Sequence, residues 1–371
     1  MPAVAAFVRG WFSEPAATFE LRSPSARWGT QRSHAPRRLR VAKVIHETPT
    51  VRSYVLETAD EANPLHFRAG QHLTLLVKID GTTHRRCYSF STAPGADARP
   101  SITVRRMPGG LVSRHLHETV NAGDMLLATD PAGEFTLATD PAASRLVAFV
   151  AGGVGVTPLV SLVECLLRQE PASRAILLCG NRSEDEIIFR GRIAELEASY
   201  APRLLVQHAL HTPPTGWTGI SGALDGRRVL DALGEVRADA YFVCGPEPMM
   251  QSVREALVGA GIAPDSIRSE RFAYANVAKA LPTLAAEITF AASGKRVTAQ
   301  PGQTILQAGI DAGLELPHSC TMGGCGACRV RKSSGDVVAS EPNCLTDRER
   351  EDGYILACCS YADGDVTIEN H

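Results

Sequence analysis

The spacing of apolar and polar residues changes along the chain, and each change marks a candidate domain. Between residues 37 and 137, short alternating runs such as Val51–Glu57 are separated by Gly and Pro, which predicts the strands of an antiparallel β-barrel. Between residues 138 and 275, apolar strand-like runs alternate with helical stretches such as 156–168 and 187–197, which predicts an α/β domain with a parallel sheet. The chain is therefore expected to be a multi-domain protein.

Three further segments complete the expected organisation. Residues 276–284 resemble a linker, and residues 285–371 form a compact β-rich unit. Residues 1–36 show no clear hydrophobic period, and the first 43 residues carry eight basic against two acidic side chains. This composition predicts a flexible basic extension; the alternative is an arm whose aromatic residues share a helical face and contact a membrane surface or an acidic partner.

Charge and composition exclude several classes of protein. Lys and Arg total 38 and Asp and Glu total 40, so the net charge of -2 excludes the overall basic field that drives nonspecific nucleic-acid binding. No run approaches the roughly 18 to 20 apolar residues that span a bilayer, and we identify no signal peptide. Because the cysteines of the first two thirds are scattered singly, we expect a cytoplasmic protein with reduced thiols.

Six of the ten cysteines lie within forty residues near the C-terminus. Cys320, Cys325 and Cys328 are spaced C-x4-C-x2-C, and Cys358 follows after 29 further residues. This is the plant-type ferredoxin spacing for a 2Fe-2S cluster, and the intervening glycines allow backbone N–H groups to approach the sulfur atoms. A structural zinc site and disulfides are the alternatives. Cys359 could also serve as the fourth ligand, although the spacing favours Cys358.

A glycine-rich loop follows the apolar run Leu146–Val150. It leads into a helical stretch, with Thr157 as the expected N-cap and Pro158 at the first helical position. A strand, a glycine turn and a helix N-terminus together bind the phosphates of a dinucleotide, whereas a tight structural turn is the alternative. A later strand ends in Cys244-Gly245-Pro246 at the edge of the same sheet where open α/β folds bind ligands, although Cys244 could be an ordinary strand-end thiol.

Two motifs of the barrel carry groups suited to phosphate and to a flat ring. Arg86-Cys87-Tyr88-Ser89 ends an expected strand, with Arg86 and Tyr88 on one face and Cys87 and Ser89 on the other. The segment 109–113 opens a short helix, whose N–H groups and hydroxyl could hold phosphate. An exposed strand with a solvated arginine is the alternative.

In this order, the motifs resemble the ferredoxin-NADP reductase superfamily, in the group with a plant-type ferredoxin domain at the C-terminus. The resemblance covers residues 38 to 371 and rests on RCYS, GGLVS, GGVGVTP, CGPEPM and the cluster cysteines. It implies an antiparallel β-barrel that binds flavin, an α/β parallel-sheet domain that binds NAD(P), and an α+β, β-grasp ferredoxin domain.

The resemblance also assigns roles to the motif residues. Arg86 would bind the flavin phosphate, Tyr88 would lie against the isoalloxazine and Ser89 near its N5. The pyrophosphate of FAD would be held by the helix-opening residues, namely Gly110, Leu111, Val112 and Ser113. The nicotinamide half of NAD(P)H would lie on the glycine loop and the later strand end, namely Gly152, Gly153, Gly155, Thr157, Pro158, Cys244, Gly245 and Pro246. Ser89 and Cys244 are the candidate catalytic residues, and Phe272 resembles an aromatic residue that related reductases place near the flavin.

The resemblance implies an NAD(P)H-dependent oxidoreductase that receives a hydride on FAD and passes electrons singly through the 2Fe-2S cluster to a separate protein. Relatives with this architecture serve phenylacetyl-coenzyme A epoxidases, ketosteroid hydroxylases, acyl-CoA desaturases and the hybrid-cluster protein. Residues 285–371 carry 12 acidic and 7 basic side chains, which would suit a basic docking face on that acceptor. A nonenzymatic iron-sulfur redox sensor and a zinc-stapled binding module are the rival functions.

The residues leave the choice between NADH and NADPH open. Related NADPH enzymes often place a Ser-Arg pair after the third strand of the nucleotide domain, where this chain has His208-Ala-Leu-His211. Arg182 follows the preceding strand and could meet the ribose of either coenzyme.

Overall fold

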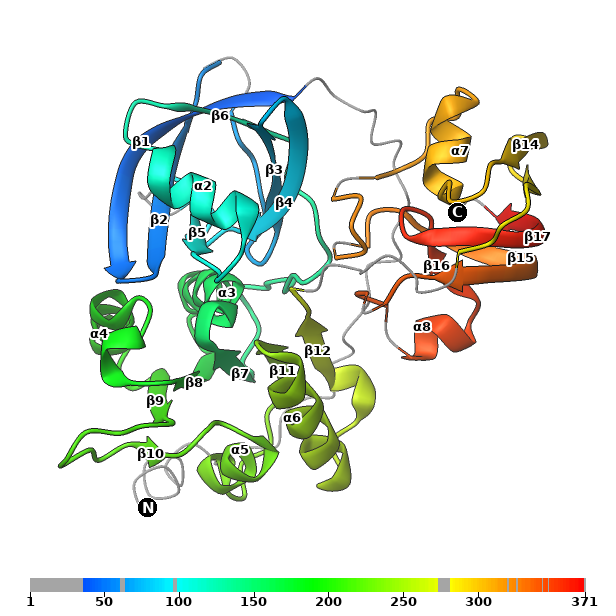
Figure 1. Cartoon of the computed structure of the whole chain (residues 1–371). Coiled ribbons are helices and arrows are strands. Elements are labelled where there is room, and N and C mark those ends of the chain that lie inside the picture. The colour runs from blue at the N-terminus through cyan, green and yellow to red at the C-terminus, as the bar shows by residue number, and fades with distance from the viewer. Residues whose placement is uncertain are drawn as a thin grey trace.

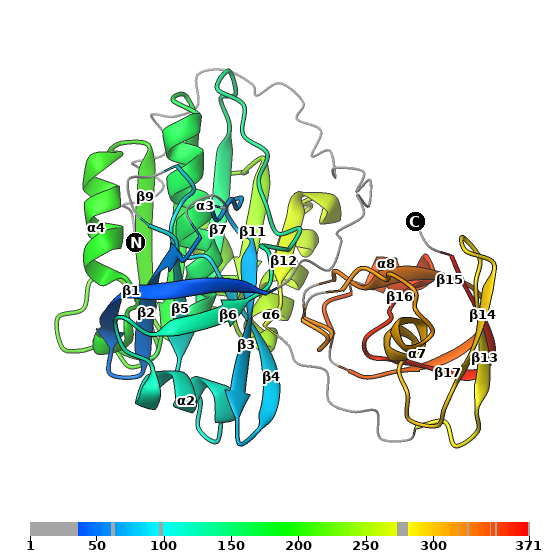
Figure 2. The ribbon, with the colours of Figure 1, turned by 90° about the horizontal axis from the view of Figure 1, so that it is seen from above.

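The computed structural model describes residues 36–60, 64–95, 99–272, 281–318, 320–324, 326–341, 343–345 and 347–369. The described residues form three sheets, each with its own hydrophobic core, and the third unit lies beside the other two (Figures 1 and 2). The expected N-terminal extension, up to residue 35, and residues 273–280 around the expected linker lie outside the described residues. The domain boundaries themselves stay a prediction.

The first unit is an antiparallel barrel. Its elements are β1 Arg37–Thr48, β2 Val51–Thr58, β3 His72–Ile79, β4 Thr82–Ser89, β5 Ser101–Arg105, α2 Leu111–Thr119 and β6 Met125–Ala128. The strand order is β4-β3-β6-β1-β2-β5, and a bridge between Phe90 and Ile102 joins the segments at the two edges. Alternate residues of β3, such as Leu73 and Leu75, fill the barrel core because successive strand residues point to opposite faces.

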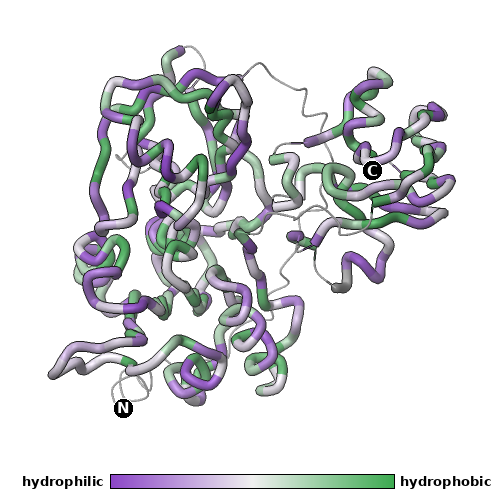
Figure 3. The backbone as a smooth tube through the Cα atoms, viewed as in Figure 1, coloured by the Kyte–Doolittle hydropathy of each residue, from purple (hydrophilic) through white to green (hydrophobic). Residues whose placement is uncertain are grey.

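The second unit is a parallel sheet with helices on both faces. Its elements are β7 Leu146–Gly152, α3 Val156–Gln169, β8 Arg174–Asn181, α4 Arg190–Ser199, β9 Leu204–Leu210, β10 Ile220–Ser221, α5 Gly226–Leu233, β11 Ala240–Cys244, α6 Glu247–Gly259 and β12 Ile267–Glu270. The strand order is β10-β9-β8-β7-β11-β12. Phe149 of β7 packs toward α3 and α4, whereas its neighbour Val150 packs toward α5 and α6. Burial on both faces explains the continuous apolar runs of these strands, which can be followed by hydropathy in Figure 3.

The third unit is a mixed sheet with one helix packed against its core. Its elements are β13 Ala286–Phe290, β14 Lys295–Ala299, α7 Ile305–Asp311, β15 Arg329–Ala339, α8 Asp347–Glu351, β16 Tyr354–Leu356 and β17 Ser360–Glu369. The strand order is β14-β13-β17-β15-β16, with β13 and β17 parallel. The three architectures confirm the expected fold class. Among the described residues, no helix combines the length and the apolar composition needed to cross a bilayer.

Helix α3 begins at Val156, as the expected helical stretch 156–168 does, but its N-cap differs from the expectation. A 3-10 turn over Gly153–Gly155 leads directly into the helix, so Gly155 is the N-cap residue and Thr157 is already the second helical residue. Its hydroxyl donates to the carbonyl of Val154 at 2.9 Å. The prediction that Thr157 is the N-cap and Pro158 the first helical residue is wrong, because the glycine turn puts the chain on a helical path earlier. By contrast, α4 begins at Arg190, later than the expected start at residue 187.

Candidate functional site

The end of the barrel strand β4 meets the edge of the nucleotide sheet. Ser89 is buried, and its Oγ donates to Oε2 of Glu270 at 3.3 Å. Glu270 ends β12 and pairs in parallel register with Cys244, the fully buried last residue of β11. The structure therefore brings the two candidate catalytic residues to one carboxyl group that the sequence patterns did not single out.

Burial controls the protonation of this group of residues. It raises the pKa of Glu270 to about 8, and the hydrogen bond from Ser89 opposes that rise only in part. Burial also raises the pKa of the Cys244 thiol well above its ordinary value, and the nearby Glu270 carboxylate adds to the effect. At neutral pH, Glu270 is therefore mostly a protonated acid and Cys244 a neutral thiol. The only sequence signal for Glu270 is its place two residues before Phe272, and that signal is weak.

The glycine loop and the end of β11 approach each other too closely for side chains. A Cβ on Gly155 would lie 2.1 Å from the carbonyl oxygen of Cys244, and one on Gly245 would lie 2.9 Å from the Cα of Gly152. On Gly152 it would lie 2.6 Å from Pro246 Cδ. The two motifs thus form one tight backbone surface at the carboxyl edge of the sheet, as close approach to a dinucleotide requires.

The N-terminus of α2 is open for an anion. Gly110 is its N-cap, and no side chain of the described residues caps its N–H groups. Ser113 Oγ accepts a hydrogen bond from the backbone N–H of Met107 at 3.1 Å, which fixes the turn before the helix. Leu111 is partly exposed and Val112 is buried. The uncapped helix end fits a phosphate group.

The β4 motif presents its residues on the two expected faces. Tyr88 lies opposite Leu73 in the ladder and packs partly against the barrel core. Arg86 is half-buried, and its Nη1 donates to the carbonyl of Arg85 at 2.7 Å and to Sδ of Met322 at 3.2 Å. The strand thus contacts the third unit as well as the second.

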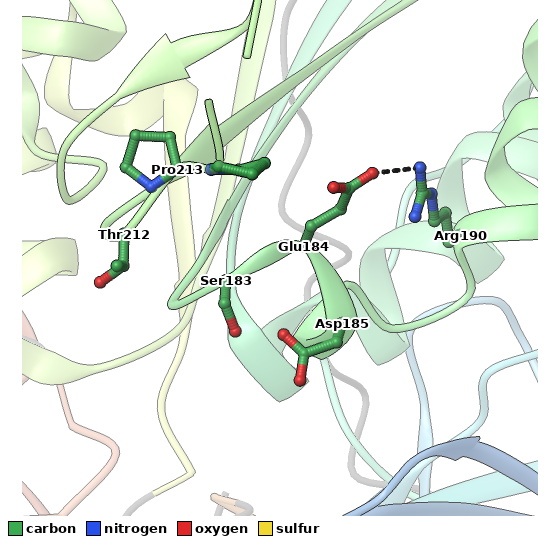
Figure 4. Close-up of a pocket in the computed structure, with 7 residues that line it drawn as sticks. Ser183, Glu184, Asp185, Arg190, Thr212 and Pro213 are labelled. Carbon is green, nitrogen blue, oxygen red and sulfur yellow. Dashed lines mark hydrogen bonds and ion pairs between the residues drawn. The ribbon is translucent and has the colours of Figure 1, made fainter. Parts of the chain in front are cut away.

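An open pocket lies beyond the carboxyl end of β8 (Figure 4). Its volume is about 500 Å³, and it is lined by Ser183, Glu184, Asp185, Arg190, Thr212, Pro213 and Pro214. Arg190 and Glu184 form an ion pair across it. Arg182 is exposed just before the pocket, and its carbonyl accepts from the Thr212 amide at 2.8 Å. Phe272 is 42% exposed at the end of the described nucleotide domain.

Three of the four predicted cluster ligands are buried in the third unit, and Cys325 lies outside the described residues. The thiol of Cys358 has Cys320, Cys328 and Cys359 as side-chain partners. Because the thiol of Cys358, between β16 and β17, meets thiols of the loop that carries Cys320 and Cys328, the donor set fits a 2Fe-2S cluster. The choice of Cys358 over Cys359 as the fourth ligand stays a prediction.

Backbone amides of the cluster loop point at the sulfur atoms. The N–H of Met322 donates to Cys320 Sγ at 3.4 Å, and that of Gly323 donates to Cys358 Sγ at 3.3 Å. Cys344, which fits no position in the ligand spacing, is half-buried and donates its amide to the carbonyl of Gly323 at 2.8 Å. The two amide bonds to sulfur are of the kind that would hold a cluster and tune it.

Comparisons with known proteins agree with this geometry. Residues 38–137 match the oxidoreductase FAD-binding domain, residues 149–255 the oxidoreductase NAD-binding domain, and residues 288–363 the 2Fe-2S iron-sulfur cluster binding domain. The chain is 31% identical over 350 residues to the glycine betaine monooxygenase reductase subunit of Pseudomonas aeruginosa, covering 89% of this chain and 94% of that relative. It is 31% identical over 343 residues to a component of the 1,2-phenylacetyl-CoA epoxidase of Escherichia coli, covering 86% of this chain and 93% of that relative.

Among solved structures, phthalate dioxygenase reductase has a similar fold. The two structures superpose with a TM-score of 0.61 and are 24% identical in sequence, and the match covers 91% of this chain and 98% of that chain. The matches confirm the expected cofactors, which are FAD, a 2Fe-2S cluster and NAD(P)H as the electron donor. The chain is an NAD(P)H-dependent oxidoreductase and belongs to the ferredoxin-NADP reductase superfamily, in the group whose flavin and nucleotide domains are followed by a 2Fe-2S ferredoxin domain.

Proposed function

We propose that this protein supplies electrons to an oxygenase and that Ser89, Glu270 and Cys244 surround the reacting atoms of flavin and nicotinamide. The observation that carries the assignment is the hydrogen bond between Ser89 and Glu270, which joins the barrel to the nucleotide sheet beside Cys244. Buried polar groups from separate domains meet in this way where a ligand is to be held between them.

The cofactors supply the redox chemistry, in which FAD takes up a hydride and the cluster carries one electron at a time. The protein's residues position the rings and manage protons. Ser89 Oγ would lie beside the reacting part of the bound flavin, and the protonated Glu270, to which it is hydrogen-bonded, would hold a proton next to it. Cys244, buried and held as a neutral thiol, adds no charge at the strand end where the nicotinamide would bind.

The assignment is tested by anaerobic rapid mixing with NADH or NADPH. We expect the flavin to bleach first and the cluster to become reduced afterwards, which is followed by its electron paramagnetic resonance. Ser89→Ala should slow flavin reduction at least about tenfold. Ser91→Ala is the matched control, because it also removes a buried hydroxyl from the same side of the chain. A wild-type flavin that does not bleach would favour a redox sensor, and a colourless protein would favour a zinc module.

We also place the adenosine end of the coenzyme in the pocket beyond β8. The ion pair with Glu184 partly neutralises Arg190, which is otherwise suited to a 2′-phosphate. Glu184→Gln should therefore raise kcat/KM for NADPH relative to NADH by about fivefold or more. An unchanged ratio would place the ribose elsewhere, and Asp231→Asn, on the exposed surface of α5, is the control.

The acceptor we propose is an oxygenase that docks on the acidic third unit. Support comes from the names of the two relatives, a monooxygenase reductase component and an epoxidase component, and from the excess of acidic residues in 285–371. The rate of acceptor reduction should then fall as ionic strength rises. A rate insensitive to salt would contradict charge-guided docking. We place the reaction in the cytoplasm, because the cysteines of the first two thirds of the chain are scattered singly.

A further inference from the structure

One side chain of the cluster loop touches the flavin barrel. Met322 lies two residues after Cys320, and its Sδ accepts a hydrogen bond from Arg86 Nη1 at 3.2 Å across 236 residues of sequence. Its own backbone N–H donates to Cys320 Sγ at 3.4 Å. Met322 therefore contacts a predicted cluster ligand through its amide and the expected flavin-phosphate arginine through its side chain. A guanidinium has five N–H donors, so contact with the thioether is compatible with a phosphate contact by the same group.

The backbone before Met322 is held in an uncommon conformation. Thr321 has φ of 57°, in the left-handed region that β-branched residues rarely adopt, and its Oγ1 donates to the carbonyl of Cys320 at 2.7 Å. Such conformations persist only where the surrounding structure over-determines them, and they concentrate at functional sites. Here the bend turns the amide of Met322 toward the cluster ligand while its side chain reaches the barrel.

A second, independent observation lies at the same junction. His72 begins β3, is 3% exposed and stands opposite Ser89 in the ladder. Its Nε2 has no hydrogen-bond partner among the described residues, which is uncommon for a buried polar atom. The barrel strand beside Ser89 thus also holds a buried polar atom without a partner among the described residues.

We propose that Met322 is the positioning residue that holds the cluster loop against the flavin barrel, so that electrons pass directly from FAD to the 2Fe-2S cluster within one chain. The inference rests on the proposed function, because NAD(P)H must first reduce the flavin. Each transfer would oxidise the flavin by one electron and reduce the cluster by one. The acceptor protein would reoxidise the cluster between the two transfers, so that both electrons of the hydride leave the flavin singly. Met322 takes no part in the chemistry. It favours the arrangement in which the two centres are close.

Two substitutions separate the hydrogen bond from the shape of the side chain. Met322→Leu keeps a similar volume and removes the acceptor, whereas Met322→Gln keeps a similar length and offers an oxygen acceptor to Arg86. In the holoenzyme, we expect Met322→Leu to slow cluster reduction about 3- to 10-fold after an unchanged flavin reduction, and Met322→Gln to remain close to wild type. Met125→Leu is the control, because it makes the same change at a 40% exposed site on β6.

A second measurement does not depend on turnover. Hydrogen exchange of β4 amides in the oxidised holoenzyme should become faster in Met322→Leu and stay unchanged in Met322→Gln, because docking protects this edge strand. The proposal is overturned if Met322→Leu matches wild type in both measurements, or if Met322→Gln is as slow as Met322→Leu. A shifted midpoint potential of the cluster in Met322→Leu would also overturn it, by attributing the slower rate to driving force. Failure of the flavin to bleach in wild type would instead refute the proposed function.

Discussion

Replacement of Glu270 by Gln tests whether a protonated carboxyl group is built into the junction of the barrel and the nucleotide sheet. Glutamine keeps the size of the side chain and an oxygen that can accept the hydrogen bond from Ser89 Oγ, but it cannot ionise. Burial raises the pKa of Glu270 from its ordinary 4.5 to about 8. The folded protein therefore binds more protons than the unfolded chain between these two values, and this group makes stability fall as pH rises toward 8.

The size of the effect follows from the two pKa values. Between pH 6 and pH 8, the Glu270 carboxyl is almost fully ionised in the unfolded chain. In the folded protein it is mostly protonated and becomes only half ionised at pH 8. The difference lowers the free energy of unfolding by about 2 kcal/mol over this interval. For a cooperative unit of roughly 150 to 250 residues, this corresponds to about 4 to 8 °C in Tm. Glu270→Gln should lose this part of the pH dependence.

The assay is thermal unfolding of wild type and Glu270→Gln at pH 6, 7 and 8, with flavin content checked in each sample. The Tm of wild type should fall more steeply with pH than that of Glu270→Gln, so the Tm of the variant should rise relative to wild type as the pH increases. Glu247→Gln is the matched control, since Glu247 is a partly exposed carboxylate paired with Arg271. Parallel curves for wild type and Glu270→Gln would show that Glu270 ionises normally in the folded protein, and the proposed proton store would then be wrong.

Three further predictions concern other parts of the molecule. Cys358→Ala should abolish the electron paramagnetic resonance of the reduced cluster and lower the iron content, whereas Cys359→Ala should keep both; the opposite result would exchange their roles. Gly155→Ala should weaken NAD(P)H binding and destabilise the nucleotide domain by about 1 to 3 kcal/mol, because its Cβ would meet the backbone carbonyl of Cys244 at 2.1 Å; a normal KM and Tm would show that the loop can shift. Glu170→Ala should cost about 3 to 5 kcal/mol in the free energy of unfolding, because it leaves Arg145 buried without the carboxylate to which it is bound at 2.5 Å; a loss below 1 kcal/mol in chemical denaturation would contradict this.

The contact between the cluster loop and the barrel also bears on the acceptor. If Met322 holds the cluster toward the flavin, an oxygenase approaches from another side or waits for the third unit to move. The two possibilities differ in how acceptor reduction responds to Met322→Leu. If the oxygenase approaches from another side, Met322→Leu should slow overall electron transfer to it. If the third unit has to move first, the weaker contact between cluster loop and barrel in Met322→Leu should speed the transfer from the cluster to the oxygenase.

Much of the fold followed from local patterns, because period and turn chemistry act over a few residues. The alternation in Val51–Glu57 predicts a strand, and the structure has strand β2 there. The apolar runs of the nucleotide domain predict strands, and in the structure these strands are buried on both faces. The glycine loop was correctly placed between β7 and α3, although its 3-10 turn makes Gly155 the N-cap in place of Thr157. The spacing of three of the cluster cysteines is likewise a local property, since Cys320, Cys325 and Cys328 follow one another closely in the sequence.

Which of these parts come into contact could not be predicted from local patterns and depends on the packing of the three units. Ser89 and Glu270 are 181 residues apart, and Arg86 and Met322 are 236 residues apart, so no local period relates them. Packing of the three units brings them together, and burial then sets properties that composition cannot carry, such as the pKa of Glu270. The chemical groups that each domain offers can be read from the amino-acid sequence, because the motifs that carry them are short and local. The structure decided how those groups are combined, because contacts between domains depend on the whole arrangement of the chain in space.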